Sequence, residues 1–273
     1  MNTLRHTRLV RREERRIRFR PLPLGWRAMT YVAVTLVLFP SLVQAADVAG
    51  NPQVVAGAAT FRQNGNIRTI EQHTGAAVIN WQDFGIKAGD VTRFVQLGVN
   101  SAVLNRVLGA NPSLIQGQLQ ANGSVYLINP NGIVVGPQGR IDVGAFFAST
   151  LNVSDDEFLK GGSLLFQGDS KAGIQNLGVI NAKDGDVMLI AYTVKNAGEV
   201  NAPKGVAGLA AGSEVLLTHQ GDQRILVRSG VKADGLETGV ENSGVVAAAQ
   251  AELKAAGGSI YKLAVNQSGV VRA

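Results

Sequence analysis

Apolar and polar residues alternate on both sides of two tight turns within residues 117–150. The alternating apolar residues are Val125, Leu127, Ile141 and Val143. A period of two residues is typical of strands that bury one face. The turns at 129–132 and 136–139 read Asn-Pro-Asn-Gly and Gly-Pro-Gln-Gly, and the first of these suits a type I turn. Short strands joined by such corners leave no room for a crossover helix, so the pattern predicts a coiled sheet.

Further strand-like stretches come before this segment and are separated by turn residues. They are Val54–Phe61, Ile67–Ile70, Val78–Phe84 and Val91–Leu97. Three large aromatic side chains, Trp81, Phe84 and Phe94, lie at apolar positions within them. Aromatic residues in such positions belong to a core more often than to a ligand site. We therefore expect these three side chains to fill the interior.

A repeat begins near residue 175. An Asn-x-Gly pattern followed by alternating apolar residues starts at Asn176, returns twenty residues later at Asn196, and recurs at Asn242 and loosely at Asn266. A glycine and a second alternating strand follow each of the first three. Two or three short strands in twenty-odd residues form one turn of a solenoid. The predicted fold is all-β, a right-handed parallel β-helix in which Asn and Gly occupy stacked corners and side-chain amides form ladders.

The first 45 residues have the pattern of a secretory signal peptide. Residues 1–27 hold nine arginines and two glutamates, and an apolar run from Ala28 to Phe39 and the small-residue site Val43-Gln-Ala45 follow. The apolar run is shorter than the roughly 20 residues that a spanning helix needs. We expect cleavage after Ala45; the alternatives are an uncleaved anchor or a nucleic-acid-binding arm.

Removal of this segment changes the charge of the protein. The whole chain has a formal net charge of +6, but residues 1–45 contribute nine Arg and two Glu, or +7. The remainder holds 17 basic and 18 acidic residues, a net charge of −1. A basic chain would suggest a nucleic-acid partner. Without its leader this chain offers no electrostatic reason to bind nucleic acid or an anionic membrane.

Three ordered motifs carry a resemblance to a known family. They are Val125-Tyr-Leu-Ile-Asn-Pro-Asn-Gly-Ile133, Ala77-Val-Ile-Asn-Trp-Gln-Asp-Phe84 and Asn100-Ser-Ala-Val-Leu-Asn-Arg106. Together they resemble the N-terminal secretion domain, or haemagglutination-activity domain, of two-partner-secretion exoproteins such as filamentous haemagglutinin and the high-molecular-weight adhesins. The resemblance extends from about Val54 to about Leu217. Long basic leaders are also a feature of this family.

The resemblance implies a function in export. The domain would be recognised by an outer-membrane two-partner-secretion pore of the Omp85 type, and the protein would be bacterial and secreted or exposed at the cell surface, by way of Sec and the periplasm. The implied secretion motif is Asn129, Pro130, Asn131, Gly132 and Ile133, and the secondary motif is Asn111, Pro112, Ser113 and Leu114. In another branch of the family the secondary motif has Asn where this chain has Ser113, so a structural corner is the better interpretation there.

The domain organisation follows from the pattern and the resemblance together. We expect an N-terminal β cap and first turns at 46–110, core turns at 111–215, an extra-helical excursion at 216–241 and further turns at 242–273. Ser154 and Glu157 have the spacing of a capping box, which predicts a short helical turn outside the coil. The chain has no cysteine. A disulfide formed in the periplasm would trap a chain that must cross the outer membrane unfolded, although a core formed by 228 residues (46–273) does not need one.

The alternative function is a polysaccharide-acting β-helix enzyme. Such enzymes place several carboxylates with Arg or Lys on one face of neighbouring turns. Here the carboxylates of Asp184, Asp186 and Glu199 lie beside turn glycines, where a surface role is favoured, and no nucleophile, zinc or phosphate motif occurs. The acidic group Asp155, Asp156, Glu157 suits a helix N-terminus better than a metal. We predict no enzyme activity, no metal and no cofactor.

The last residues, Val271-Arg-Ala273, stop inside a repeat. Exoproteins of this family often continue for many hundreds of residues, so the sequence suggests a truncated gene or a fragment of a larger adhesin. A site for a host-cell glycan or protein would then lie in the missing C-terminal region.

Overall fold

The computed structural model describes residues 50–218, 224–227, 239–256 and 264–273. The account below concerns the unit formed within residues 43–273. The predicted signal peptide and its cleavage site at Ala45 lie outside the described residues.

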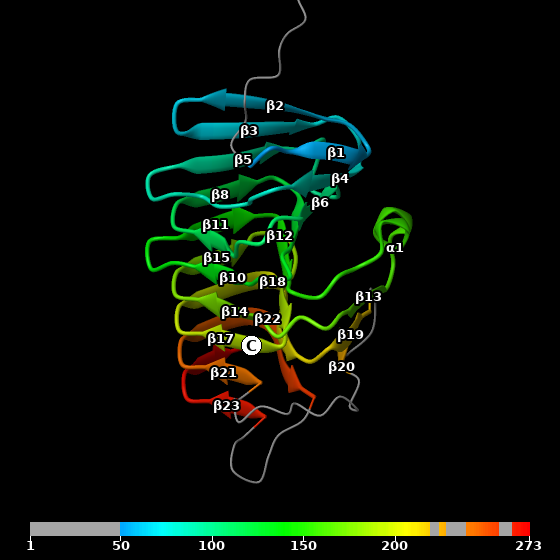
Figure 1. The fold of residues 1–273 in the computed structure, drawn as a ribbon. Helices are drawn as coiled ribbons and strands as arrows, with labels where there is room; N and C mark the ends of the chain where they lie inside the picture. Colours follow the sequence, from blue (N-terminus) through cyan, green and yellow to red (C-terminus); the bar gives the residue numbers. More distant parts are fainter. Residues whose placement is uncertain (1–49, 219–223, 228–238, 257–263) are drawn as a thin grey trace, which may run out of the picture. The chain divides into compact units, whose positions relative to one another are not determined.

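Most described strands belong to one 15-stranded, largely parallel sheet that coils upon itself (Figure 1). Its strands are β1 (Gln53–Ala56), β2 (Ala59–Asn64), β3 (Ile67–Gln72), β4 (Ala76–Trp81), β5 (Val91–Val95), β6 (Ala102–Val107), β8 (Gln118–Ala121), β9 (Ser124–Ile128), β11 (Arg140–Val143), β12 (Ala145–Ser149), β15 (Val179–Ala182), β16 (Val187–Ala191), β18 (Glu199–Ala211), β22 (Val245–Ala255) and β24 (Val270–Arg272). The long strand β18 pairs with both β15 and β16, so it joins two faces of the coil and nearly closes the sheet.

A second, six-stranded parallel sheet forms another face of the coil. Its strands are β7 (Ser113–Ile115), β10 (Ile133–Val135), β14 (Gly173–Asn176), β17 (Thr193–Asn196), β21 (Val240–Asn242) and β23 (Val265–Gln267). Each turn of the chain visits this sheet and then the larger one, and each strand pairs in parallel with the equivalent strand one turn away. The β-helix predicted from the repeats is confirmed.

The N-terminal end of the coil is built differently. β1 pairs antiparallel with β4, and β2 pairs antiparallel with β3, whereas β3 and β5 continue the parallel stack. An antiparallel strand can follow its partner through a short turn, while a parallel strand needs a long return path. Two such pairs therefore cover the start of the coil, as the N-terminal β cap was predicted to do.

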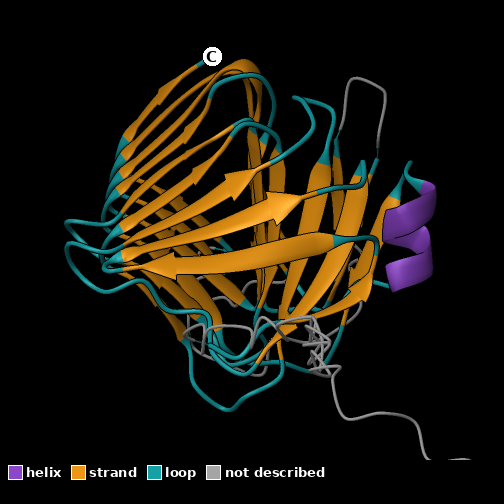
Figure 2. Cartoon of the chain, turned by 90° about the horizontal axis from the view of Figure 1, so that it is seen from above, coloured by secondary structure: helices purple, strands orange, loops and turns teal. Residues whose placement is uncertain are grey.

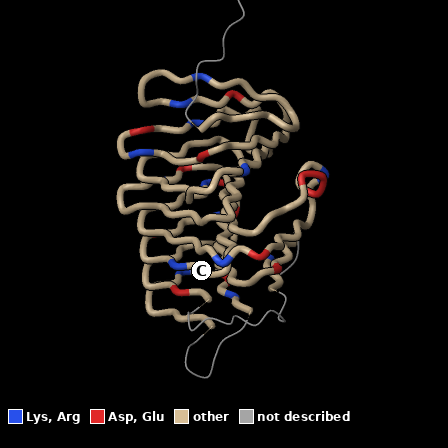
Figure 3. The backbone as a smooth tube through the Cα atoms, in the orientation of Figure 1, with Lys and Arg blue, Asp and Glu red and all other residues tan. Residues whose placement is uncertain are grey.

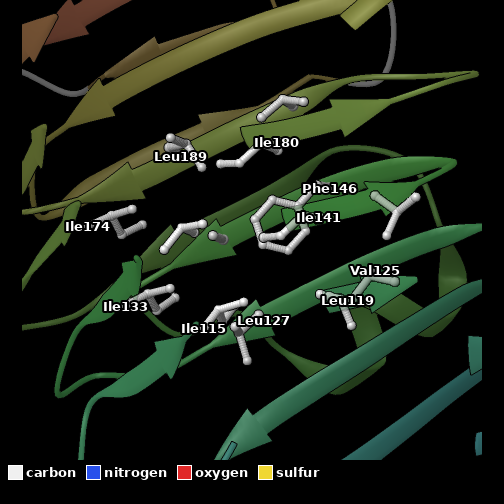
Figure 4. Packing of buried hydrophobic residues seen from close by; sticks show 14 of the residues in the cluster. Ile115, Leu119, Val125, Leu127, Ile133, Ile141, Phe146, Ile174, Ile180 and Leu189 are labelled. Carbon is white, nitrogen blue, oxygen red and sulfur yellow. The ribbon is translucent and has the colours of Figure 1, made fainter. Parts of the chain in front are cut away.

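The interior is a stack of apolar side chains in register. One column consists of Leu119, Ile141, Ile180, Val200 and Val246, which are direct partners in successive turns. All five are completely buried, and Figure 4 shows the first three within the same packed interior. Strand alternation aims every second side chain into this space. The apolar residues that recur at every second position of the sequence therefore form the core.

Amide ladders form at the corners, as predicted. The Nδ2 atom of Asn176 donates to Oδ1 of Asn196 at 2.8 Å, Asn196 donates to Asn242 at 2.7 Å, and Asn242 donates to Oε1 of Gln267 at 2.7 Å. Glycine stacks beside the ladder: a Cβ atom on Gly198 would lie 2.2 Å from the backbone oxygen of Gly178 in the preceding turn. The two residue types recur because neighbouring turns approach closely there.

A small subdomain packs outside the coil, visible beside it in Figures 1 and 2. It contains helix α1 (Asp155–Lys160) and a three-stranded antiparallel sheet of β13 (Leu164–Gln167), β19 (Glu214–Leu217) and β20 (Ile225–Val227). A second apolar cluster joins it to the coil. That cluster includes Phe147, Phe158, Phe166, Met188 and Ile190.

The short helix was expected after Thr150, but the capping box is wrong. Ser154 is the N-cap residue of α1, yet its side chain makes no capping hydrogen bond. The helix is instead held from the coil: Nη1 of Arg106 lies 2.6 Å from Oδ1 of Asp155, and Phe158 is buried in the second apolar cluster. Tertiary contacts fix this helix, so the local cap is not needed.

Candidate functional site

The expected secretion motif forms the corner between β9 and β10. The backbone N–H of Gly132 donates to the carbonyl oxygen of Asn129 at 3.1 Å, which is the closing bond of a β-turn. The backbone N–H of Asn131 donates to Oδ1 of Asn129 at 2.9 Å. Gly132 has φ of +113°, a conformation that L side chains rarely adopt. The motif therefore specifies one tight corner.

The Asn129 side chain also ties this corner to the preceding turn. Its Nδ2 atom donates to the carbonyl oxygen of Asn111 and to Oγ of Ser113, both at 3.0 Å. Asn129 and Ser113 are completely buried. The hydroxyl group of Ser113 thus accepts a hydrogen bond from the secretion motif. The structure brings the two motifs together as stacked corners.

The two motifs divide into buried and exposed residues. Ile133 is completely buried and belongs to the core of the coil. Pro130, Asn131 and Pro112 are exposed, and 46% of Leu114 is accessible. The buried residues of the motifs can affect a partner only through the shape of the corner, whereas the exposed residues can contact a partner directly. Asn131 is accessible to a partner and also helps to hold the shape of the corner, because its exposed side chain donates from Nδ2 to the carbonyl oxygen of Gly109 at 2.7 Å.

Sequence reasoning missed two contacts of this corner. The carbonyl oxygen of Pro130 accepts a 2.6 Å hydrogen bond from Oγ of Ser170, and the carbonyl oxygen of Gly109 accepts the bond from Asn131. Ser170 lies 40 residues away in the chain, beyond the outer subdomain helix. No local pattern marks it. The roughly one-turn spacing between Asn111 and Asn129 was the available signal that those two residues would meet.

Two of the three carboxylates weighed for an enzyme, Asp184 and Asp186, are engaged with cations. A groove of about 550 Å³ between the coil and the outer subdomain is lined by Tyr126, Asp184, Asp186 and Arg224, among others. Oδ2 of Asp186 lies 2.7 Å from Nη2 of Arg224, and Oδ1 of Asp184 lies 2.9 Å from Nζ of Lys204. Burial, with the nearby Asp186 carboxylate, raises the pKa of the Tyr126 hydroxyl well above its usual value. Ion pairs of this kind serve structure, and Glu199 lies exposed on the surface of the coil.

The described residues combine charges of both signs along the coil and show no cluster for a metal. Lys and Arg are scattered among Asp and Glu along the turns, and acidic residues gather only in the first turn of α1 within the described ranges (Figure 3). Within the described ranges, no group of three or more His, Cys, Asp or Glu side chains is placed to hold a metal ion. The same ranges contain no helix of the length and hydropathy needed to cross a membrane.

Comparisons with known proteins agree with this geometry. The chain matches the family described as "TPS secretion domain" over residues 45–273. A heme/hemopexin-binding protein of Haemophilus influenzae is 33% identical over 242 residues, covering 84% of this chain and 26% of that protein. A second heme/hemopexin-binding protein of that species is 42% identical over 82 residues, covering 30% of this chain and 9% of the relative. The chain thus spans about a quarter of the length of the first relative.

Two solved structures have the same fold. The HMW1 secretion domain from Haemophilus influenzae superposes with a TM-score of 0.61 at 30% identity, over 81% of this chain and 64% of that one. The filamentous hemagglutinin secretion domain gives a TM-score of 0.55 at 18% identity, over 81% of this chain and 98% of that one. The family has no enzymatic activity, so the enzyme alternative is set aside. This chain belongs to the TPS secretion domain family, whose members are recognised for two-partner secretion in haemagglutinin and adhesin exoproteins.

Proposed function

We propose that residues 46–273 are read in the periplasm by an outer-membrane pore of the Omp85 type, after export through Sec and removal of residues 1–45. The protein then leaves the cell or remains at its surface. The observation that carries the proposal is the family match across residues 45–273, almost the whole chain after the predicted cleavage site. A partner pore is the second component that a two-partner system requires.

The order of the strands supports transfer as an extended chain. Along the repeats, each strand pairs in parallel with its equivalent one turn before, as β14 does with β10 and β17 with β14. Such a coil can form turn by turn as the chain emerges, with each turn providing the edge for the next. Before that, extended segments can pair with strand edges of the pore's periplasmic domains, because backbone hydrogen bonds give affinity and alternate side chains give specificity. Folding outside the cell supplies the driving force.

The exposed face of the secretion motif is the proposed contact. Asn131 combines an accessible side chain with a bond to Gly109, whereas Asn129 and Ile133 are buried. We expect Asn131→Ala to lower the amount of secreted protein several-fold and to raise periplasmic degradation products. Gly132→Val should do the same, because a branched side chain strains a residue at φ +113°. The measurement is a quantitative immunoblot of medium and periplasm in a strain that carries the pore.

A matched control separates recognition from folding. Gln138→Ala changes an exposed residue in the next corner, at 136–139, and should leave secretion at the level of the unchanged chain. Refolded Asn131→Ala protein should keep the Tm of the parent within about 2 °C, a change of less than ~1 kcal/mol in a domain of this size. Normal secretion of both Asn131→Ala and Gly132→Val would refute a role for the corner.

What the exported protein binds is a second proposal. The two curated relatives are both named heme/hemopexin-binding protein. We therefore propose that the target is a host protein, hemopexin, rather than a host glycan. Retention of hemopexin on immobilised secreted protein, compared with retention on a glycan array, tests this choice.

A further inference from the structure

The dipeptide Asn-Gly occurs three times in the chain, at 64–65, 122–123 and 131–132, and the third copy belongs to the secretion motif. Asn-Gly is chemically fragile, because the backbone nitrogen that follows an asparagine can attack the side-chain amide of that asparagine. Glycine favours the attack, since it has no Cβ atom to hinder the approach and its backbone is permissive. The reaction needs a free nitrogen and a free amide, so the surroundings of each copy decide whether it reacts.

Exposure of the asparagines does not separate the three copies, because all three side chains are exposed. The glycines differ. Gly123 and Gly132 are buried, whereas Gly65 is exposed. A Cβ atom on Gly65 would meet nothing within 4 Å beyond the adjacent residues. The attacking nitrogen of the first copy is therefore open to solvent, while those of the other two copies are covered.

In the copy at 122–123, hydrogen bonds hold both reacting groups. The backbone N–H of Gly123 donates to Oε1 of Gln96 at 2.8 Å. The Asn122 side chain pairs with the backbone of the same glutamine: Oδ1 accepts from its N–H at 2.7 Å, and Nδ2 donates to its carbonyl oxygen at 2.9 Å. Gln96 thus restrains the nitrogen and the amide together.

The copy in the secretion motif is held in a comparable way. The backbone N–H of Gly132 donates to the carbonyl oxygen of Asn129 at 3.1 Å, and Nδ2 of Asn131 donates to the carbonyl oxygen of Gly109 at 2.7 Å. Both bonds must break before the nitrogen can reach the side chain. The shape of the corner therefore protects Asn131.

The first copy lies at the turn between β2 and β3 and lacks such bonds. Asn64 and Ile67 are the last paired residues of the hairpin, so the turn has two residues, and Gly65 in it has φ of +57°. The carbonyl oxygen of Gly65 accepts from Nε2 of Gln63 at 2.7 Å, which leaves the nitrogen free. Among the described residues, neither the N–H of Gly65 nor the side chain of Asn64 has a hydrogen-bond partner.

This end of the hairpin is also the easiest to open. β2 is the last strand of the large sheet and pairs only with β3. Opening a strand end at the edge of a sheet costs few contacts. The far side of the turn is anchored, because Nδ2 of Asn66 donates to the carbonyl oxygen of Gly89 at 2.6 Å. Local opening is therefore confined to the side of the turn that carries Asn64.

We propose that Asn64 is a site of spontaneous deamidation and isomerisation in the folded protein, and that the corner of the secretion motif keeps Asn131 unmodified. The nitrogen of Gly65 forms a bond to Cγ of Asn64 and the Cγ–Nδ2 bond breaks. Ammonia leaves with the proton of the Gly65 amide, and a five-membered succinimide ring remains. One water molecule then opens the ring at either carbonyl group, which gives aspartate or isoaspartate.

The two outcomes differ in their consequences. At the hairpin both products add a carboxylate, and isoaspartate also lengthens the backbone by a methylene group, which disrupts the pair of Asn64 and Ile67. Because β2 covers the start of the coil, the modification loosens the cap. At Asn131 the same reaction would remove the Nδ2 donor that holds Gly109. Folding therefore protects the secretion motif, while the reactive copy lies in the cap.

Peptide mass mapping of the full-length chain tests the proposal. The chain is incubated in mildly alkaline buffer, folded and in guanidinium chloride, and aspartate and isoaspartate are quantified at the three sites. In denaturant the three copies should react at similar rates. In the folded chain Asn64 should stay within about three-fold of that rate, whereas Asn122 and Asn131 should slow by about ten-fold or more, because their reaction requires local opening. Equal rates at the three sites of the folded chain, or a slower reaction at Asn64 than at Asn131, would overturn the proposal.

One variant tests the cause of the protection. Gln96→Ala removes the acceptor of the Gly123 N–H, so the rate at Asn122 should rise several-fold while the rate at Asn131 stays that of the parent. Gln120→Ala is the matched control, because this glutamine lies on the neighbouring strand β8 and bonds to none of the three copies. It should leave all three rates unchanged. An unchanged rate at Asn122 in Gln96→Ala would overturn hydrogen bonding as the cause.

Discussion

The cap and the repeats both enclose a buried interior, but different kinds of side chain fill it. In the cap the interior is filled by large aromatic rings: Trp81 packs edge-on against Phe61 and Phe84, with ring centroids 6.0 and 5.1 Å apart. In the repeats, small and branched aliphatic residues stack in columns, and asparagines stack on asparagines. The cap has no preceding turn to repeat, so each of its side chains must fit a unique space.

One column of the six-stranded sheet shows where the change occurs. Ile115 and Val135 occupy it in the earlier turns, and Asn176 and Asn196 occupy the same register in the later ones. A buried amide is tolerated only when its hydrogen bonds are made. The repeats meet this condition because an identical residue lies one turn away. Regularity therefore supplies the partners in the repeats, whereas the buried Asn105 of the cap region relies on unlike partners, Nε1 of Trp81 and a backbone carbonyl oxygen.

The largest expected effect breaks the cap side of the comparison. Trp81→Ala removes two ring contacts and the 3.0 Å bond from Nε1 to Oδ1 of Asn105. We expect a loss of about 3–5 kcal/mol in the free energy of unfolding. Val200→Ala, in a repeat column, should cost about 1.5 kcal/mol through its lost methyl groups. Urea unfolding followed by circular dichroism measures both, and equal losses would mean that the cap is no more specialised than the repeats.

An intermediate effect tests the buried ladder. Asn196→Ala deletes the middle rung, so the amide of Asn176 keeps only its bond to the carbonyl oxygen of Glu199, and Oδ1 of Asn242 loses its donor in a fully buried position. We expect a cost of about 1–3 kcal/mol. The control is Asn181→Ala in a second, half-buried ladder of Asn201, Asn181 and Asp142, which we call the outer ladder. In it Asn201 donates to Asn181 at 2.9 Å. A cost there as large as that of Asn196→Ala would show that burial does not set the strength of these ladders.

The smallest effect concerns the charged end of the outer ladder. Burial tends to raise the pKa of Asp142, but hydrogen bonds from Arg140 and Asn181 outweigh it and hold the pKa below its ordinary value. A carboxyl group whose folded pKa is lowered contributes stability above its unfolded pKa, near 3.9, and loses it as the pH falls through the folded pKa. Asp142→Asn should therefore cost about 0.2–1 kcal/mol at neutral pH, as an exposed ion pair does.

The acid range completes that prediction. Once the pH falls below the lowered pKa of folded Asp142, the difference between Asp142→Asn and the parent should vanish, because both chains are then neutral at this position. Unfolding midpoints in urea at several pH values provide the measurement. A difference that stays constant from neutral to acid pH would exclude titration of Asp142 as its cause.

The sequence by itself determined the strands, the corners and the stacking of the repeats. Alternation around Val125 and Ile141 predicted strands, and the spacing of Asn176 and Asn196 predicted the ladder that the structure contains. These signals can be read locally because each turn of a solenoid contacts mainly its neighbours. Residues one period apart in the sequence are therefore adjacent in space.

Only the tertiary structure decided the contacts that have no period. β13 pairs with β19, about fifty residues later, and Arg106 anchors α1 where the sequence suggested a capping box. The tertiary structure also places Arg68 over two aromatic rings, at a pocket beside the secondary motif. Such contacts depend on how the outer subdomain and the cap pack on the coil. Packing of that kind is fixed by the shapes of side chains distant in sequence, and neither alternation nor repeat spacing encodes it.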